Sequence, residues 1–342
     1  KSKLKSRAWG ISSRAPRSDP KEFFPRLEHV LKNTLNAYAI PGELLGFELS
    51  GGLDSSTLPL FMTAHYPDTP WMGASITYPD VFGVTQTRKL QSIFERAPQA
   101  TLQVITPDEA ALALAAPFTN PHPVPIFPHE GSPLEPLEKI AGVFKNAGVK
   151  TVFHGMGGDE LFEHTVDIEQ QLSIGTLAAQ DRQMHIAGFF APSFRALVGE
   201  AVSLNTEEAL PLLSTTTATV LSALNININH GVWPVSPFQN SELYTYCQGL
   251  AWKFRNQKQI LRAYYKLKNF PSVLYTGAYQ NEDFDSFYNN ALSGDAYASV
   301  VQRFAESSIL GELGYIDIPS LLQTYNNVRQ GTVPPDTNLY CI

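Results

Sequence analysis

The chain has 342 residues, is 43% hydrophobic and carries a formal net charge of −7 at pH 7. No apolar run approaches the ~18 residues of a membrane-spanning helix, and proteins that bind nucleic-acid phosphates carry clustered excess Lys and Arg. We therefore expect a soluble, cytoplasmic protein whose partners are small molecules or peptides, without nucleic acid or membrane.

Residues 1–19 differ in composition from the rest of the chain. They carry six Lys and Arg residues, have no acidic residue before Asp19 and show no hydrophobic periodicity. We interpret them as a basic tail or linker. The following residues predict an amphipathic helix that ends near Pro41 and Gly42, because apolar side chains recur at helical spacing: Phe24, Leu27, Val30, Leu31 and Leu35.

A glycine loop follows. Residues 49–56 read LSGGLDSS and lie between an apolar run over 44–49 and a helix-compatible run over 57–64. Gly51 and Gly52 let the backbone approach a ligand closely, so that the first N–H groups and the positive end of the helix face one point. Such a point binds an anion, most often phosphate. The lysine of the nucleoside triphosphatase loop is missing, and Asp54 at the helix start implies a magnesium ion beside the phosphates.

The next elements alternate between strand and helix. We predict a strand over 71–77, a helix over 85–96 and a strand over 101–105. A short helix after Thr106 then leads into a proline-rich loop over 121–136, which is placed to wall the site. A helix over 134–144, capped by Gly148, precedes a strand over 150–153. This alternation predicts an α/β protein with a parallel sheet covered on both faces.

A second glycine loop follows that last strand. Residues 151–162 read TVFHGMGGDELF, so glycines again follow a β-branched strand and precede an acidic pair, Asp159 and Glu160. Together the two loops resemble the two signatures of the asparagine synthetase superfamily, from about Lys21 to about Pro271. The resemblance implies the five-stranded parallel sheet of the adenine nucleotide α-hydrolase type, a PP-loop ATP pyrophosphatase fold. Both loops then lie at the carboxyl ends of neighbouring strands.

Helical patterns dominate after Phe162. We therefore expect one synthetase-like domain over 20–342, in which 20–165 form the α/β nucleotide-binding part and 166–342 a mainly helical part. Within the helical part, residues 257–262 resemble the family's Lys-x-x-Leu-Arg helix. The resemblance makes Lys258 the catalytic residue, which counters charge on an acyl-adenylate. Arg262 is expected to be structural.

The resemblance also implies ATP and Mg²⁺ as cofactors. It makes Asp54 and Asp159 the metal ligands. The residues that it assigns to ATP and pyrophosphate are Ser50, Gly51, Gly52, Asp54, Ser55, Ser56, Ile76, Gly155 and Gly157. The serines could equally cap the helix, and we favour Ser50 and Ser56 as ligands.

Two departures from the family bear on chemistry. Met156 stands where amide-forming relatives have a glutamate or a tyrosine that acts on the attacking amine, and methionine cannot exchange protons. The base then lies elsewhere, for instance at His154 or Glu160, or the nucleophile differs. Of the family segment Glu-x-Arg-x-Pro-Phe-Leu-Asp, residues 233–240 keep only the Pro-Phe core, which argues against aspartate as substrate.

These observations predict a C–N ligase that adenylates a carboxylate and passes the acyl group to an amine or ammonia. A specialised amide or lactam synthetase, like those that close β-lactams or lasso peptides, fits better than a housekeeping asparagine synthetase. The family's glutaminase begins with a catalytic cysteine, and no cysteine precedes Cys247, so a separate glutaminase or a carrier or precursor partner is a further expectation. A sulfur transferase and a catalytically degenerate partner subunit remain alternatives.

Overall fold

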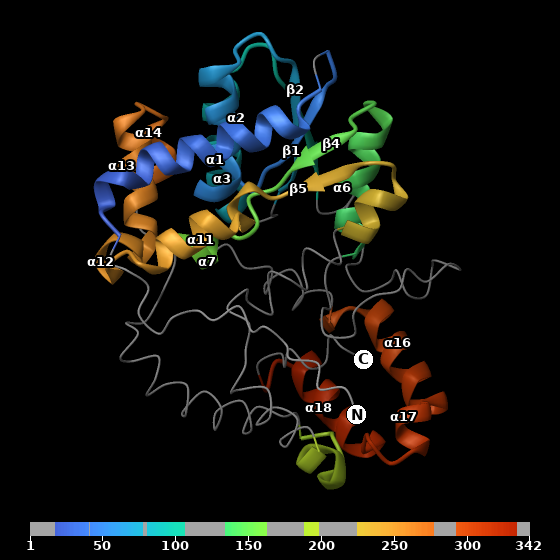
Figure 1. The fold of residues 1–342 in the computed structure, drawn as a ribbon. Helices are drawn as coiled ribbons and strands as arrows, with labels where there is room; N and C mark the ends of the chain where they lie inside the picture. Colours follow the sequence, from blue (N-terminus) through green and yellow to red (C-terminus); the bar gives the residue numbers. More distant parts are fainter. Residues whose placement is uncertain are drawn as a thin grey trace, which may run out of the picture.

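The computed structural model describes residues 18–40, 42–77, 81–106, 134–162, 188–197, 224–276 and 292–333 (Figure 1). The short helix expected after Thr106, the proline-rich loop up to Pro133 and most of the basic tail lie outside these residues. Within the described ranges, no helix combines the length and the apolar composition that crossing a membrane requires.

The fold is built on a five-stranded sheet in the order β3-β2-β1-β4-β5, and every neighbouring pair is parallel. This confirms the α/β fold class and the five-stranded parallel sheet. The chain runs outward from β1 through β2 to β3 and then returns to the other side of β1 with β4. Ligands of such sheets bind outside the carboxyl ends of the two strands where the direction reverses. The strands are β1 (Leu45–Glu48), β2 (Trp71–Ile76), β3 (Thr101–Ile105), β4 (Thr151–Phe153) and β5 (Trp233–Val235).

Two hydrophobic clusters cover the two faces of the sheet. On one face, the stacked rings of Phe47 and Phe153 belong to a large cluster with side chains of α1 (Phe23–Tyr38), α2 (Leu53–His65) and α3 (Val81–Phe94). On the other face, Val152 packs with Phe144 of α6 (Leu134–Asn146).

Two helices begin earlier than the sequence pattern indicates. The helix expected over 85–96 begins at Val81, and the α2 helix begins directly at Leu53.

The second half of the chain contributes to the same body. Its strand β5 pairs with β4, so the sheet takes its fifth strand from residues that the sequence division assigned to the helical part. Helices that follow β5 pack against α1, α2 and α7 (Gly158–Phe162). They are η2 (Pro237–Gln239), α11 (Ser241–Gln248), α12 (Trp252–Arg255), η3 (Asn256–Lys258), α13 (Gln259–Leu267) and α14 (Ser272–Tyr275).

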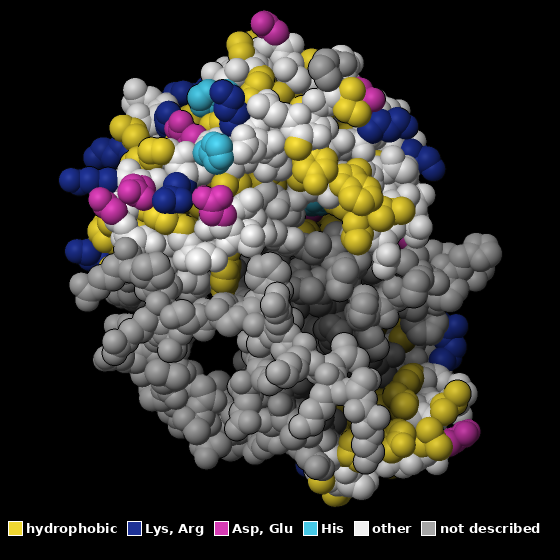
Figure 2. Space-filling model, viewed as in Figure 1, with side chains coloured by type: hydrophobic (Ala, Val, Ile, Leu, Met, Phe, Trp, Pro, Cys, Tyr) yellow, Lys and Arg dark blue, Asp and Glu magenta, His cyan; other side chains and the backbone are white. Residues whose placement is uncertain are grey.

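Mixed charges cover one side of this body. Figure 2 shows Lys and Arg side chains interleaved with Asp and Glu over the region of α1, α11 and α13. Arg26 of α1 pairs with Glu22 at 3.1 Å and with Glu242 at 3.2 Å, and Lys268 pairs with Glu28 at 2.5 Å. The region of α1, α11 and α13 therefore carries both signs of charge side by side.

The last helices form a separate cluster. They are α16 (Asp295–Ser307), α17 (Ile309–Glu312) and α18 (Ile318–Arg329), and Figure 1 shows them away from the sheet. Their buried side chains, among them Val301 and Leu321, pack with Phe189, and an antiparallel bridge joins Phe190 to Ile316.

Candidate active site

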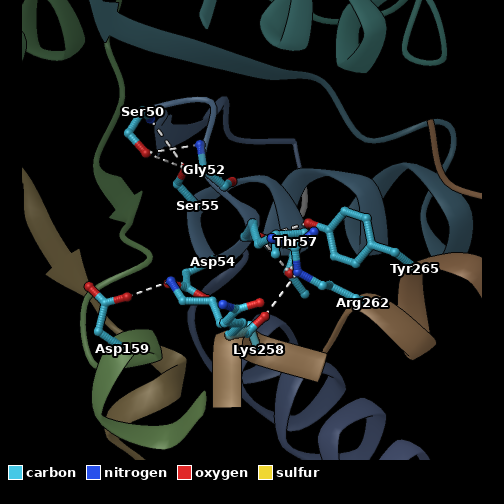
Figure 3. Close-up of polar contacts among 11 residues, drawn as sticks. Ser50, Gly52, Asp54, Ser55, Thr57, Asp159, Lys258, Arg262 and Tyr265 are labelled. Atoms are coloured by element: carbon cyan, nitrogen blue, oxygen red, sulfur yellow. Dashed lines mark hydrogen bonds and ion pairs between the residues drawn. The ribbon is translucent and has the colours of Figure 1, made fainter. Parts of the chain in front are cut away.

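The first glycine loop joins β1 to α2 through a tight turn. Gly51 has φ +80°, a conformation that side chains rarely adopt, and Gly52 is the N-cap of α2. Serine hydroxyls close the loop: the Gly52 N–H donates to Ser50 Oγ (3.1 Å), and the Ser50 N–H donates to Ser55 Oγ (3.2 Å). The loop therefore holds its shape through contacts of its own (Figure 3).

Ser56, which we favoured as a ligand, lies deeper than Ser50. Ser50 is exposed, whereas Ser56 is fully buried and its Oγ has no hydrogen-bond partner in the described part of the chain. Of the three serines, Ser50 thus lies in the loop surface, whereas Ser55 and Ser56 are buried behind it.

Gln86 of α3 fixes the end of β2 beside this loop. Its Nε2 donates to the Ile76 carbonyl (2.8 Å) and to Ser75 Oγ (3.3 Å), and the residue is 2% exposed. A Cβ on Gly51 would lie 3.3 Å from Gln86 Cγ. Gln86 therefore sets Ile76 next to the loop, although no sequence pattern had singled out this glutamine.

The second glycine loop lies directly on the first. A Cβ at Gly155 would come within 2.5 Å of the Ser55 nitrogen, and a Cβ at Gly158 within 2.2 Å of Asp54 Cγ. Both positions therefore require glycine, because any side chain there would push the loops apart. Gly157, at φ +90°, turns the chain against the backbone of Phe238, so the segment that follows β5 supports this loop from behind.

Lys258 joins the two predicted metal ligands. Its Nζ lies 2.5 Å from Asp54 Oδ2 and also pairs with Asp159 Oδ1, as Figure 3 shows. The Asp54 and Lys258 side chains are 12% and 8% exposed, whereas that of Asp159 is 64% exposed. Three residues from distant parts of the chain thus meet at the carboxyl ends of β1 and β4, and one carboxylate of the group faces outward.

A strained turn presents this lysine. Gln257 and Lys258 have φ values of 51° and 57°, a left-handed conformation that costs non-glycine residues free energy and clusters at functional sites. The turn is braced from α13, where Arg262 Nε donates to the Gln257 carbonyl (2.9 Å) and the guanidinium also reaches the Tyr275 carbonyl. Arg262 thus holds the backbone that aims Lys258 at the loops.

The site has an unusual electrostatic balance. Burial raises the pKa of Asp54 to about 7, against the opposing attraction of Lys258, and the nearby Asp159 raises it further. Two carboxylates and one ammonium leave this part of the site with a net negative charge when all three are ionised. A cation that binds here would relieve the repulsion between the carboxylates.

The donor set fits magnesium. Asp54 Oδ1 is buried and has no hydrogen-bond partner among the described residues, and a bound cation would give this oxygen the partner that it lacks. No group of three or more His, Cys, Asp or Glu that could hold a metal occurs in those residues. Mg²⁺ commonly takes one or two carboxylates and completes its octahedron with phosphate oxygens and water, which Asp54 and Asp159 would permit.

A buried histidine–glutamate pair lies beside the loops. His154 Nδ1 is 2.7 Å from Glu48 Oε2, with side-chain exposures of 3% and 22%. Neither ring nitrogen has a well-aligned hydrogen bond to a described residue. Because Phe47 and Phe153 face the other way, both side chains lie on the α6 side of the sheet. Met156 is half-buried in the turn of the second loop.

Sequence reasoning identified the two loops and Lys258 but missed their supports. Glu48, Thr57, Gln86 and Tyr265 belong to no motif. Glu48 and Tyr265 act on residues more than a hundred positions away, and Thr57 and Gln86 act on backbone carbonyls, which leave no trace in a side-chain pattern. One signal was available: Tyr265 follows Lys258 by seven residues, the spacing of one helical face, although Lys258 itself stands just outside the helix as the N-cap of α13.

The chain is similar to one known protein family and to several solved structures. The asparagine synthase family model matches residues 26–332. Among 39 matching chains of solved structures, the U34-tRNA thiolase NcsA from Methanococcus maripaludis, with its 4Fe-4S cluster, shares 9% sequence identity and a TM-score of 0.36; the match covers 91% of this chain and 80% of that chain. A likeness at this level carries no argument about function. No curated protein matches the chain.

Proposed function

The chain belongs to the asparagine synthase family, and we propose that it forms an amide bond by adenylating a substrate carboxylate. The observation that carries this proposal is the meeting of Lys258 with Asp54 and Asp159 at the carboxyl ends of β1 and β4. One cationic and two anionic groups converge there beside two glycine loops. Such a site can bind a polyphosphate and neutralise the charge that develops when it is cleaved.

The proposed reaction has two steps. The carboxylate attacks the α-phosphate of ATP, the bond between the α- and β-phosphates breaks, and pyrophosphate leaves. An amine or ammonia then attacks the acyl carbon, loses a proton and displaces AMP. The first-turn N–H groups of α2 bind the pyrophosphate, and Lys258 counters the charge that grows on the acyl-adenylate. Mg²⁺, held by Asp54 and Asp159, would supply charge neutralisation on the phosphates.

The first test is the position of bond cleavage. The protein, incubated with MgATP, candidate carboxylates and an ammonium salt, is expected to release AMP and pyrophosphate in equal amounts. Chromatography of the nucleotides and an enzymatic pyrophosphate assay measure both products. Release of ADP and phosphate would contradict adenylation. If ATP were not cleaved at all, the result would favour a catalytically degenerate partner subunit.

For the proton on the amine we propose His154 as the acceptor, with Glu48 holding its ring. Met156 cannot take up a proton, whereas an imidazole can, and the Glu48 carboxylate 2.7 Å from His154 Nδ1 can orient the ring. The other ring nitrogen, Nε2, is buried and has no hydrogen-bond partner among the described residues, and it is the atom that would take the proton. The Glu160 side chain lies outside the described residues.

His154→Asn is expected to lower amide formation about a hundredfold while ATP–pyrophosphate exchange stays within about threefold, because a general base contributes only to the second step. The carboxylate that gives AMP in the first test serves as substrate. Hydroxylamine, a weakly basic amine, should recover part of the lost rate. His230→Asn, a histidine near β5, serves as control. An equal fall of both steps in His154→Asn would instead indicate a structural role.

The alternative keeps the adenylation and passes sulfur to the activated substrate. It needs a reactive thiol. Cys247 is fully buried, and burial raises the pKa of its thiol to about 12, which leaves little thiolate at neutral pH. Cys341 lies outside the described residues. These facts favour nitrogen over sulfur as the nucleophile.

We further propose a specialised amide or lactam synthetase that acts on a small-molecule or peptide carboxylate. The segment after β5 supports the second loop with Phe238. The centroid of its ring lies 5.6 Å from that of Phe162, in an edge-to-face contact. It lacks most of the charged residues of the corresponding family segment. An aspartate substrate is therefore disfavoured, and we propose ammonia from a separate glutaminase as a nitrogen source.

A further inference from the structure

We infer that Tyr265 is a positioning residue that strengthens pyrophosphate binding by polarising the peptide group between Leu53 and Asp54. The inference rests on the proposed function, because it concerns the anion that the first loop would bind. It assigns a task to a residue of α13 that belongs to neither loop.

The contacts converge on one oxygen. Tyr265 Oη donates to the Leu53 carbonyl at 2.7 Å, and Thr57 Oγ1 donates to the same carbonyl at 2.8 Å. The two hydroxyls are 3.0 Å apart, and both residues are fully buried. The helical hydrogen-bond ladder directs the Thr57 N–H to this oxygen as well. Figure 3 shows the Tyr265 ring directed at Thr57.

The Leu53 carbonyl shares its peptide group with the Asp54 N–H. Leu53 is the first residue of α2, so the N–H groups of Leu53, Asp54 and Ser55 have no acceptor within the helix and point out of its amino-terminal end. Hydrogen bonds accepted by a carbonyl draw electron density from the amide and make its N–H a stronger donor. The two buried hydroxyls that donate to the Leu53 carbonyl thus act on the Asp54 N–H, a donor that faces the predicted phosphate position.

The same contact fixes the helix that carries Lys258. Lys258 is the N-cap of α13 and reaches Asp54, and Tyr265 within the same helix donates to the Leu53 carbonyl. The α13 helix therefore touches the first turn of α2 at two points. Loss of the Tyr265 hydroxyl would remove one point and leave the ion pair as the other.

Tyr265→Phe isolates the hydroxyl. The phenylalanine ring keeps the edge contact with Phe270, whose ring centroid is 5.2 Å away, and the Leu53 carbonyl keeps Thr57 as a donor, so the fold is expected to persist. Tyr264→Phe is the matched control. It removes a hydroxyl from an equally buried ring of the same helix, and that ring packs against Phe24 of α1.

The experiment measures dissociation constants by calorimetry for MgATP, magnesium pyrophosphate and AMP. In Tyr265→Phe we expect the constants for MgATP and pyrophosphate to rise about 1.5-fold to fourfold, because polarisation changes the strength of one charge-assisted hydrogen bond by about a tenth to a third, while AMP binds as before. Tyr264→Phe should match the wild type for all three. Thr57→Val should weaken the same two ligands, and its effect should not add to that of Tyr265→Phe, because both hydroxyls act on one oxygen.

Unchanged affinity of Tyr265→Phe for MgATP and pyrophosphate would overturn the inference. Equal weakening of AMP would do so too, since it would indicate a general loss of structure. If the wild type binds neither MgATP nor pyrophosphate, the proposed function itself fails, so the wild-type and variant measurements separate the two failures.

Discussion

Asp54→Asn and Asp159→Asn are each expected to lower AMP formation at least about a hundredfold, which corresponds to about 2.7 kcal/mol of transition-state stabilisation. Each change removes one negative charge from the group that would hold Mg²⁺ against pyrophosphate. The fold is expected to survive, because the amide has the shape of the carboxylate and Lys258 keeps its other partner.

The measurement is the initial rate of AMP release as a function of magnesium concentration. Asp295→Asn is the control, since Asp295 is an exposed carboxylate that pairs with Arg329 in the carboxyl-terminal cluster. It should leave the rate unchanged. If Asp54→Asn or Asp159→Asn kept the wild-type rate and the wild-type magnesium dependence, the metal assignment of that residue would be wrong.

Lys258→Ala should lower amide formation at least about a hundredfold while the affinity for ATP stays within a few-fold. The charge that the lysine counters grows on the reacting acyl-adenylate, in a site where Lys258 itself is only 6% exposed. Arginine keeps the charge but not the compact ammonium, so Lys258→Arg should recover only part of the rate. Single-turnover kinetics and calorimetry separate the two effects.

Folding must be checked in the same experiment. Removing Lys258 leaves the buried Asp54 without its cation, and the position has φ +57°, which strains alanine as it strains lysine. Lys258→Met, which keeps the length of the side chain, and a thermal unfolding curve show whether the loss is chemical. Lys268→Ala is the control, because Lys268 also forms an ion pair, with Glu28, at the other end of α13.

Met156→Leu provides the opposite expectation. It preserves volume and polarity and should be nearly silent for turnover. If Met156→Leu abolished amide formation while Lys258→Ala reacted normally, the roles that the family resemblance assigns would fail at the centre of the site.

The sequence by itself determined the local units of this protein. Each glycine loop is a strand, a turn and a helix start within about a dozen residues, so its shape follows from glycine conformations and helix termini that a short segment can specify. The alternation of apolar runs then indicated a parallel sheet. Lys258 was recognised through its neighbours, Leu261 and Arg262, again within one turn or two of helix.

Only the tertiary structure decided which of these units meet. It placed Lys258 between Asp54 and Asp159, His154 beside Glu48, and the Tyr265 hydroxyl on the Leu53 carbonyl. It also supplied the fifth strand, Trp233–Val235, from a segment with a proline and no clear strand pattern. These contacts join residues that are about 80 to 210 positions apart, and side-chain periodicity reports only which face of an element is buried, not which partner covers it.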